Sequence, residues 1–521
     1  MNNEPREEGI LPGLEGGPQL PVTSTAPASS PRVKAVNRNQ MIFQTVDVEK
    51  LIEEHHPARS IWAFVGQLDL SRFYAAIAAT EGQAGRTAWD PRVLISLWIY
   101  AYSVGIGSAR EIGRRCCFDP AFQWLSGMER INYHTLSDFR VGYTEGLQEL
   151  FVQVLGVLSA EGLVSLERVM HDGTKIKACA GADSFRREQR VRAHLEAARE
   201  QIQALDDPQA HEPSRSEAAR QRVLKEREQR LEQALQELSK IQEAKSGAQA
   251  QEAARVSTSD PEARIMKQSD GGYAPSYNVQ LSTEASHKII VAAEVSQSSS
   301  DYGELIPAVE RIQENLGQKP RQMVADGGFT SRDNIVQMEA KGVDFIGSLG
   351  EGRTPQSLGQ MKRRGVDPAF YPAAFVYDAL GDTYRCPAGK ILRHSGQEQR
   401  PGVVQHHYRA EEKVCAACPF KAQCSPQNDR KGRSIARPVQ APSVQAFAEK
   451  MQTEEAQKIY RQRGPIAEFP NAWIKAKLGL RQFRLRTMVK VRMEVLWACL
   501  TYNIQQWIRA CRLPKLNGNA V

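Results

Sequence analysis

The feature that most constrains the fold is a change in apolar spacing near residue 164. Between Val164 and Gly350, short runs rich in β-branched residues alternate with stretches whose apolar residues recur every three or four positions. Such alternation is typical of strands and amphipathic helices that share one mixed sheet. We therefore predict an α/β domain over residues 164–350, completed by the helical pattern that returns over residues 445–512.

Two segments interrupt this α/β pattern. Residues 184–253 are charged and rich in Ala, Leu, Glu, Arg and Gln, with apolar residues at helical spacing and a break at 206–213. This predicts a helical hairpin inserted into the sheet domain and stabilised by pairing of its two arms. Residues 351–444 are irregular, rich in Pro and Gly, and carry four of the nine cysteines. We interpret them as a separate cysteine-bearing insertion.

The N-terminal part of the chain divides into a tail and a helical domain. Residues 1–38 lack apolar periodicity, which predicts a disordered tail, and residues 513–521 form a second tail. Residues 39–163 have helical spacing and are expected to form an all-helical, DNA-binding domain. Its arginines fit either a helix-turn-helix that reads DNA or a plain helical bundle. These arginines are Arg110, Arg114, Arg115 and Arg140.

Positive charge is concentrated near the C-terminal end. The whole chain has a formal net charge of +8, whereas residues 461–512 hold eleven Lys and Arg against two acids, Glu468 and Glu494. A concentrated basic segment is typical of a surface that binds DNA phosphates, and a solvated basic face is the alternative. The cations expected to contact phosphate are Arg481, Arg484, Arg486 and Lys490.

The sequence lacks the features of exported and membrane proteins. The first ten residues have neither the basic nor the apolar region of an export signal, and the longest nearly apolar stretch, 94–107, is shorter than the roughly 18–20 residues that span a bilayer. We expect a reduced, cytoplasmic, nucleoid-associated protein with no membrane partner. The pair Gly389–Lys390 is followed by Ile391 and not by Ser or Thr, so no nucleotide cofactor is expected.

Three acids predict a metal site. Asp172 and Asp326 each end an apolar run and are each followed by glycine, and Glu468 lies in a helical context. The carboxyl ends of strands are where an α/β sheet places its active site. Carboxylates on separate elements suit Mg²⁺ or Mn²⁺, which complete their coordination with water and phosphate oxygens. A turn residue is the alternative for either aspartate taken alone.

These acids stand in longer motifs. HDGT at 171–174, VADGGF at 324–329, and the set Tyr460, Arg463, Glu468 and Lys475 resemble the DDE transposases of bacterial insertion sequences. STSDPEARIMK at 257–267 and YNVQ at 277–280 narrow the resemblance to the insertion-sequence group called eleven-eighty-two, over residues 45–510. One spacing differs, because four residues separate Arg463 from Glu468 where the Tyr-Arg-Glu-Lys signature has three.

The resemblance implies a ribonuclease H-like fold and DNA transposition. Asp172, Asp326 and Glu468 would hold two Mg²⁺ or Mn²⁺ ions across the scissile phosphate. Tyr460, Arg463 and Lys475 would grip the cleaved DNA, with helix packing as the alternative for Tyr460. The partners would be double-stranded terminal inverted repeats and target DNA, bound by a homodimer when synapsed. The alternatives are a metal-dependent nuclease on the same fold and a catalytically inactive DNA-binding protein.

Four cysteines predict a structural zinc site in the second insertion. A C-x₂-C pair with two more cysteines nearby, in a reduced compartment, is typical of tetrahedral Zn²⁺. The alternatives are four reduced thiols, or replacement of one thiol ligand by His394, His406 or His407. The cysteines are Cys386, Cys415, Cys418 and Cys424.

Overall fold

The computed structural model describes residues 39, 41, 43, 45–77, 87–205, 215–348, 358–400, 402–427 and 432–512. Both predicted tails, 1–38 and 513–521, lie outside these residues. The chain divides into two units, residues 1–47 and 48–521, and every element below belongs to the second. Among the described helices, none is both long enough and apolar enough to cross a bilayer.

The first part of this unit is helical, and its helices begin where the sequence encodes caps. Asp90, Asp119 and Asn132 each accept a hydrogen bond from a backbone N–H in the first turn of the helix that follows, and proline occupies the first position of α1, α3 and α5. The elements are η1 (Val48–Lys50), α1 (Pro57–Val65), α2 (Ser71–Ala75), α3 (Pro91–Ser103), α4 (Ala109–Arg115), α5 (Pro120–Ser126), α6 (Tyr133–Gly142) and α7 (Thr144–Ala160).

A mixed sheet follows, as the alternating pattern predicts. The described residues form a six-stranded sheet in the order β4-β5-β1-β7-β8, with β6 paired to β5. β1 runs antiparallel to β5 and parallel to β7. The strands are β1 (Arg168–Lys177), β4 (Arg264–Lys267), β5 (Tyr273–Glu284), β6 (Ile290–Ser296), β7 (Gln322–Val324) and β8 (Asp344–Ile346), with helices α11 (Leu305–Leu316) and α12 (Arg332–Ala340) between them.

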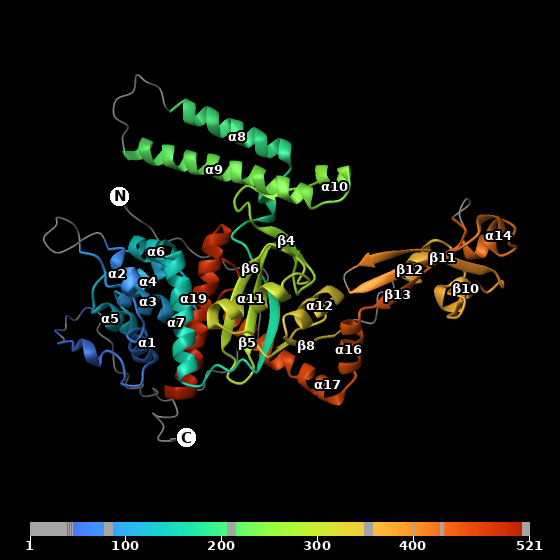
Figure 1. Cartoon of the computed structure of the whole chain (residues 1–521). Coiled ribbons are helices and arrows are strands. Elements are labelled where there is room, and N and C mark those ends of the chain that lie inside the picture. Colours follow the sequence, from blue (N-terminus) through green and yellow to red (C-terminus); the bar gives the residue numbers. More distant parts are fainter. Residues whose placement is uncertain are drawn as a thin grey trace, which may run out of the picture. The chain divides into compact units, whose positions relative to one another are not determined.

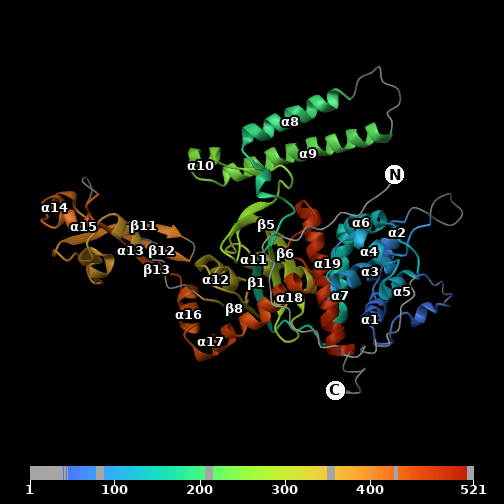
Figure 2. The same ribbon diagram turned by 180° about the vertical axis from the view of Figure 1, so that it is seen from behind.

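The last long helix, α19 (Met488–Trp507), joins the helical part to the sheet (Figures 1 and 2). Its residues are buried around most of its circumference, and it contacts α3 and α7 on one side and β6 on the other. Trp497 packs against Trp98 with ring centroids 6.3 Å apart and donates its indole N–H to the Arg140 carbonyl at 3.2 Å. The two parts therefore share one hydrophobic core.

The first insertion contains two long helices, α8 (Glu188–Gln203) and α9 (Arg215–Glu243), which lie side by side (Figure 1). Val191, Leu195, Leu231 and Leu238 form the apolar seam between them. The short helix α10 (Ala248–Glu252) follows, and a ribbon of β2 (Phe185–Arg186) and β3 (Val256–Ser257) closes the base. The predicted break at 206–213 lies outside the described residues.

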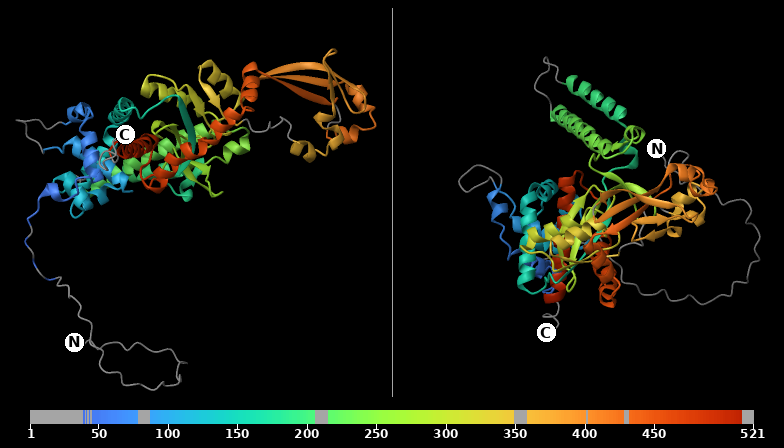
Figure 3. Two further views of the ribbon diagram at one scale, coloured as in Figure 1. Left: turned by 90° about the horizontal axis from the view of Figure 1, so that it is seen from below. Right: turned by 45° about the vertical axis from the view of Figure 1, so that its right-hand side comes forward.

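The second insertion has an irregular sequence, yet its described residues form regular structure. Its described residues form a five-stranded antiparallel sheet in the order β13-β12-β11-β10-β9 (Figure 3). These strands are difficult to recognise in the sequence. β11 exposes most of its side chains on both faces, so its sequence lacks the apolar alternation that marks a strand. The elements are α13 (Leu358–Arg363), η3 (Pro368–Phe370), η4 (Pro372–Ala374), β9 (Val376–Asp378), β10 (Thr383–Arg385), β11 (Ile391–Arg400), β12 (Val403–Ala410), α14 (Glu412–Ala416), α15 (Lys421–Cys424) and β13 (Ser434–Gln440).

The chain then returns to helices that lead to the sheet. α16 (Pro442–Lys450) and α17 (Glu454–Arg461) are separate helices because the hydroxyl of Thr453 caps the second one, accepting a hydrogen bond from the Ala456 N–H. A π-helical turn, η5 (Gly464–Glu468), continues from α17 and passes directly into α18 (Phe469–Ala476).

Candidate active site

Asp172 lies in the middle of β1, so the prediction that it ends its strand was wrong. The antiparallel partner β5 extends β1 to Lys177, whereas the parallel partner β7 pairs only with Arg168–Met170. Asp172 therefore lies just beyond the parallel pairing, and Asp326 follows β7 by two residues. The structure brings both carboxylates to the carboxyl side of the β1–β7 pair, as the sequence predicts.

The third acid, Glu468, reaches the same place through a π-helical turn. Arg463 lies between the acids, with Nη1 3.8 Å from Asp172 Oδ1 and Nη2 3.9 Å from Glu468 Oε1. In the family signature the Arg-to-Glu spacing is one residue shorter, and a π turn accommodates one extra residue within a helix. Across this π turn, Arg463 and Glu468 face each other.

The Asp172 carboxylate is buried without close charge compensation. Its side chain is 16 % exposed, and Asn471 Nδ2 donates to Oδ2 at 2.9 Å. Burial raises the pKa of Asp172 to about 6; Arg463 opposes this shift and the nearby Asp326 carboxylate adds to it. Glu468 is 66 % exposed. A buried carboxylate with a second carboxylate nearby is suited to a divalent cation.

α18 presents one face to β1. Glu468, Asn471 and Lys475 follow one another at intervals of three and four residues and so share this face. Lys475 Nζ donates to the Thr174 hydroxyl, and burial lowers the pKa of Lys475 although Asp172 favours its charged form. Sequence reasoning missed Asn471, and this helical spacing from Glu468 is the signal that identifies it.

Another acid that sequence reasoning missed, Asp301, lies in the loop between β6 and α11 and packs against β1 and β5. Its Oδ1 accepts hydrogen bonds from Lys175 Nζ at 2.9 Å, from Asn278 Nδ2 at 2.7 Å and from Gln280 Nε2 at 2.9 Å. A Cβ at Gly173 would come within 2.7 Å of the same oxygen, so only glycine allows this approach. The YNVQ stretch thus supplies two of the donors that hold Asp301 beside β1.

Tyr460 lies against the sheet and is partly buried. It packs on the apolar cluster that includes Met170, Val324 and Ile346. This packing is what we expect if Tyr460 has a structural role and does not contact DNA.

The four expected phosphate-binding cations follow α18 and are exposed. Residues 481–482 run beside the end of β1, where the Lys177 N–H donates to the Arg481 carbonyl at 3.3 Å. The positive charge of Arg481 also contributes to lowering the pKa of Lys475, which places it near the acid site. Arg486 Nε donates to the Cys179 carbonyl at 3.0 Å. The cations are Arg481, Arg484, Arg486 and Lys490.

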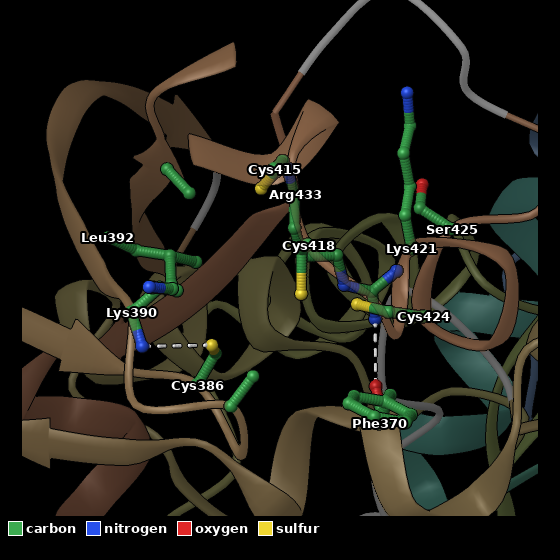
Figure 4. Close-up of a pocket in the computed structure, with 12 residues that line it drawn as sticks. Phe370, Cys386, Lys390, Leu392, Cys415, Cys418, Lys421, Cys424, Ser425 and Arg433 are labelled. Atoms are coloured by element: carbon green, nitrogen blue, oxygen red, sulfur yellow. Dashed lines mark hydrogen bonds between the residues drawn. The ribbon is translucent and has the colours of Figure 1, made fainter. Parts of the chain in front are cut away.

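The four cysteines of the second insertion come together around one small cavity of about 30 Å³ (Figure 4). They carry free thiols. Cys386 Sγ accepts from the Lys390 N–H at 3.3 Å, Cys415 Sγ accepts from the Arg433 N–H at 3.4 Å, and burial raises the pKa of Cys424. The fourth is Cys418.

None of the three predicted histidine substitutes lines the cavity. His394 and His406 instead face each other on β11 and β12, with Nε2 and Nδ1 3.2 Å apart. In the described part of the chain, no three or more His, Cys, Asp or Glu side chains are arranged to hold a metal ion, either at the acids or at the cysteines. Side-chain movement would have to bring the ligands together around an ion.

Two family models match the chain. Residues 385–508 match a transposase DDE domain, and residues 46–141 match a transposase domain (DUF772). The first match covers the four cysteines, Glu468 and Lys475 but begins after Asp172 and Asp326. Neither a curated protein nor a solved structure matched the chain. The two family matches indicate a DDE-type insertion-sequence transposase.

Proposed function

We propose that this protein cleaves the ends of its insertion sequence and joins them to target DNA by in-line phosphoryl transfer, on a ribonuclease H-like sheet domain. One observation carries the proposal. Asp172 on β1 meets Arg463 and Asn471 from the segment that matches a transposase DDE domain, although Asn471 lies 299 residues away in sequence, and Arg463 in turn reaches Glu468. This contact supports a site shared by β1 and the matched segment.

Asp172, Asp326 and Glu468 would hold two Mg²⁺ or Mn²⁺ ions. The burial that raises the pKa of Asp172 to about 6 supports this assignment, because a bound cation would compensate the buried negative charge. When bound, the ions would activate water or a 3′-hydroxyl and stabilise the leaving oxygen.

The cations around the acids would hold the DNA. Arg463 spans Asp172 and Glu468 at 3.8 and 3.9 Å, too far for strong ion pairs, so its planar guanidinium is available to a phosphate. Lys475 would add a point charge next to Thr174. Tyr460 would support Arg463 through its packing on the sheet.

The cysteine cluster would hold one structural Zn²⁺ through Cys386, Cys415, Cys418 and Cys424. The N–H donors at Lys390 and Arg433 support this role because they would orient thiolates and stabilise their charge. The ion would take no part in catalysis.

The partners would be terminal repeat and target DNA, bound by a homodimer at the nucleoid. An assay with duplexes that carry the DNA flanking this gene, a target plasmid and Mg²⁺ tests the proposal. Transposition predicts 3′-end cleavage followed by covalent joining to the plasmid. Nicks without joined product would instead indicate a nuclease, and binding without nicks an inactive DNA-binding protein.

A further inference from the structure

Residues 484–488, which we name the arginine loop, connect the acid site to α19 and carry Arg484 and Arg486. Three carboxylates hold the loop by its backbone. Glu494 accepts from the N–H groups of Arg484 and Leu485, both at 3.1 Å. Asp260 Oδ1 accepts from the Thr487 N–H at 3.2 Å, and Glu262 Oε2 accepts from the Met488 N–H at 2.8 Å.

Two of these carboxylates are fully buried, with Asp260 0 % and Glu494 1 % exposed. Burying a charge is costly unless it is hydrogen-bonded, so these side chains are committed to the contacts they make. Asp260 also accepts from the Tyr277 hydroxyl at 2.8 Å. The loop is therefore tied to β5 through the YNVQ stretch.

The loop itself is strained. Thr487 has a φ of 75°, a left-handed conformation that a β-branched residue adopts only where its surroundings impose it. Thr487 also gives α19 no side-chain cap. Asp260 and Glu262 supply the missing acceptors from another part of the chain, and their negative charge at a helix N-terminus is favourable.

The same segment reaches the helical hairpin. Arg264 pairs with Glu237 on α9, and Gln297 donates to the Glu262 carbonyl at 2.9 Å. The STSDPEARIMK motif thus contacts the hairpin, the sheet and the arginine loop. These contacts explain a motif to which the acid site assigns no role.

We propose that Asp260, Glu262 and Glu494 are positioning residues that hold the arginine loop so that Arg484 and Arg486 grip duplex DNA. Two contacts direct the side chains: Arg486 Nε donates to the Cys179 carbonyl, and the Arg484 guanidinium lies over Gly107, where a Cβ would come within 3.1 Å of it. This inference rests on the proposed function, because it assumes that the protein binds DNA.

Electrostatics alone predicts the opposite effect of these acids. A carboxylate beside a DNA-binding surface repels phosphate, so its removal should strengthen binding. A positioning role predicts weaker binding when the backbone acceptor is lost. Glu262 is the best probe because it is only partly buried.

The experiment measures the affinity of the full chain for mixed-sequence duplex DNA across a salt series. Glu262→Ala removes acceptor and charge, Glu262→Gln keeps an acceptor, and Glu262→Asp keeps the charge on a side chain too short to reach the Met488 N–H. Glu310→Ala, which removes a surface acid paired with Lys341, is the control for net charge. Thermal unfolding verifies that each variant is folded.

We expect Glu262→Ala and Glu262→Asp to weaken binding and to reduce the slope of log K against log salt by up to about 1.8, at about 0.9 for each of two lost phosphate contacts. Glu262→Gln should bind at least as tightly as wild type. In an Arg484→Ala/Arg486→Ala background, Glu262→Ala should have no further effect. Should Glu262→Ala not fold, Glu262→Asp carries the test.

Suppose that Glu262→Ala and Glu262→Asp both bind as tightly as wild type or more tightly, with the wild-type salt slope. If the double arginine variant nevertheless binds weakly, the positioning role is overturned and the proposed DNA binding is not. If the double arginine variant binds DNA as tightly as wild type, both the positioning role and the assignment of Arg484 and Arg486 to DNA binding are wrong. The two failures are therefore distinguishable.

Discussion

The acid site and the cysteine cluster are built in opposite ways. The acid site is assembled from segments far apart in sequence, since Asp172 on β1 is fixed by β5 and by a hydrogen bond from Asn471, 299 residues away. The cysteines all lie between Cys386 and Cys424, on the short helices α14 and α15 and on loops, around a small core that includes Phe375, Leu392 and Tyr408. The acid site is therefore supported by a large core, whereas so small a core would depend on a crosslink such as a bound metal ion.

The largest expected effect is on the cysteine cluster. Replacing Cys415 and Cys418 together by Ser, or removing metal with a chelator, should unfold residues 358–440 while the catalytic sheet stays folded, because structural zinc supplies much of the folding energy of a small domain. Limited proteolysis with mass spectrometry measures this, and metal analysis should find one Zn²⁺ per chain. Cys117→Ser, at an exposed cysteine outside the cluster, is the control.

The prediction is wrong if protein that was never exposed to chelator contains no zinc and all four thiols titrate freely. The cluster would then be four reduced thiols.

A smaller effect is expected on DNA affinity, and it distinguishes the residues that bind DNA from the acids that would cleave it. Replacing Arg481, Arg484, Arg486 and Lys490 together by Ala should weaken binding to every sequence and flatten the salt dependence by about 0.9 per lost phosphate contact. Sequence preference should hardly change, because phosphate contacts carry no base information. Affinity measured across a salt series checks this. An unchanged slope would mean that the basic segment is a solvated face.

The smallest effect is a gain in stability at the acid site. The pKa of Asp172 is about 6 in the folded protein and about 3.9 in an unfolded chain, so the folded state binds the proton more tightly. The ionised carboxylate therefore destabilises the fold at pH 7 by up to about 3 kcal/mol, and this cost disappears as the pH falls from 7 through 6 toward 4.

Asp172→Asn should consequently stabilise the metal-free protein at pH 7 by about 1–3 kcal/mol, with little gain at pH 4. Denaturant unfolding at the two pH values measures it. The sign is opposite to that expected for the cysteine variants, which lose a stabilising site. Equal or lower stability of Asp172→Asn at pH 7 would show that the carboxylate is already compensated.

Elements could be predicted from the sequence where the local pattern of side chains agrees with the fold. The strand that carries Asp172 and the strand that precedes Asp326 include apolar runs, and α3 begins at Pro91 behind the cap residue Asp90. β11 escaped notice because it buries little on either face. The π-helical hydrogen bonding of η5 could not be predicted either, because it differs from an α-helix in its backbone pairing and not in a pattern of side chains.

Asp301 escaped notice for another reason. Its partners Lys175, Asn278 and Gln280 lie on β1 and β5, and only the folded sheet brings them together. No spacing within one segment encodes a contact between segments that are far apart in sequence.

The central claim is that Asp172, Asp326 and Glu468 hold the metal ions that cleave DNA. Cleavage of element-end DNA in Mg²⁺ by three single variants, each acid replaced by Ala, tests it most directly when binding to the same DNA is measured in parallel. We predict that each variant loses cleavage and keeps binding, because the acids oppose phosphate electrostatically yet are needed to hold the ions. An Asp326→Ala protein that cleaves at a rate near wild type would contradict the claim.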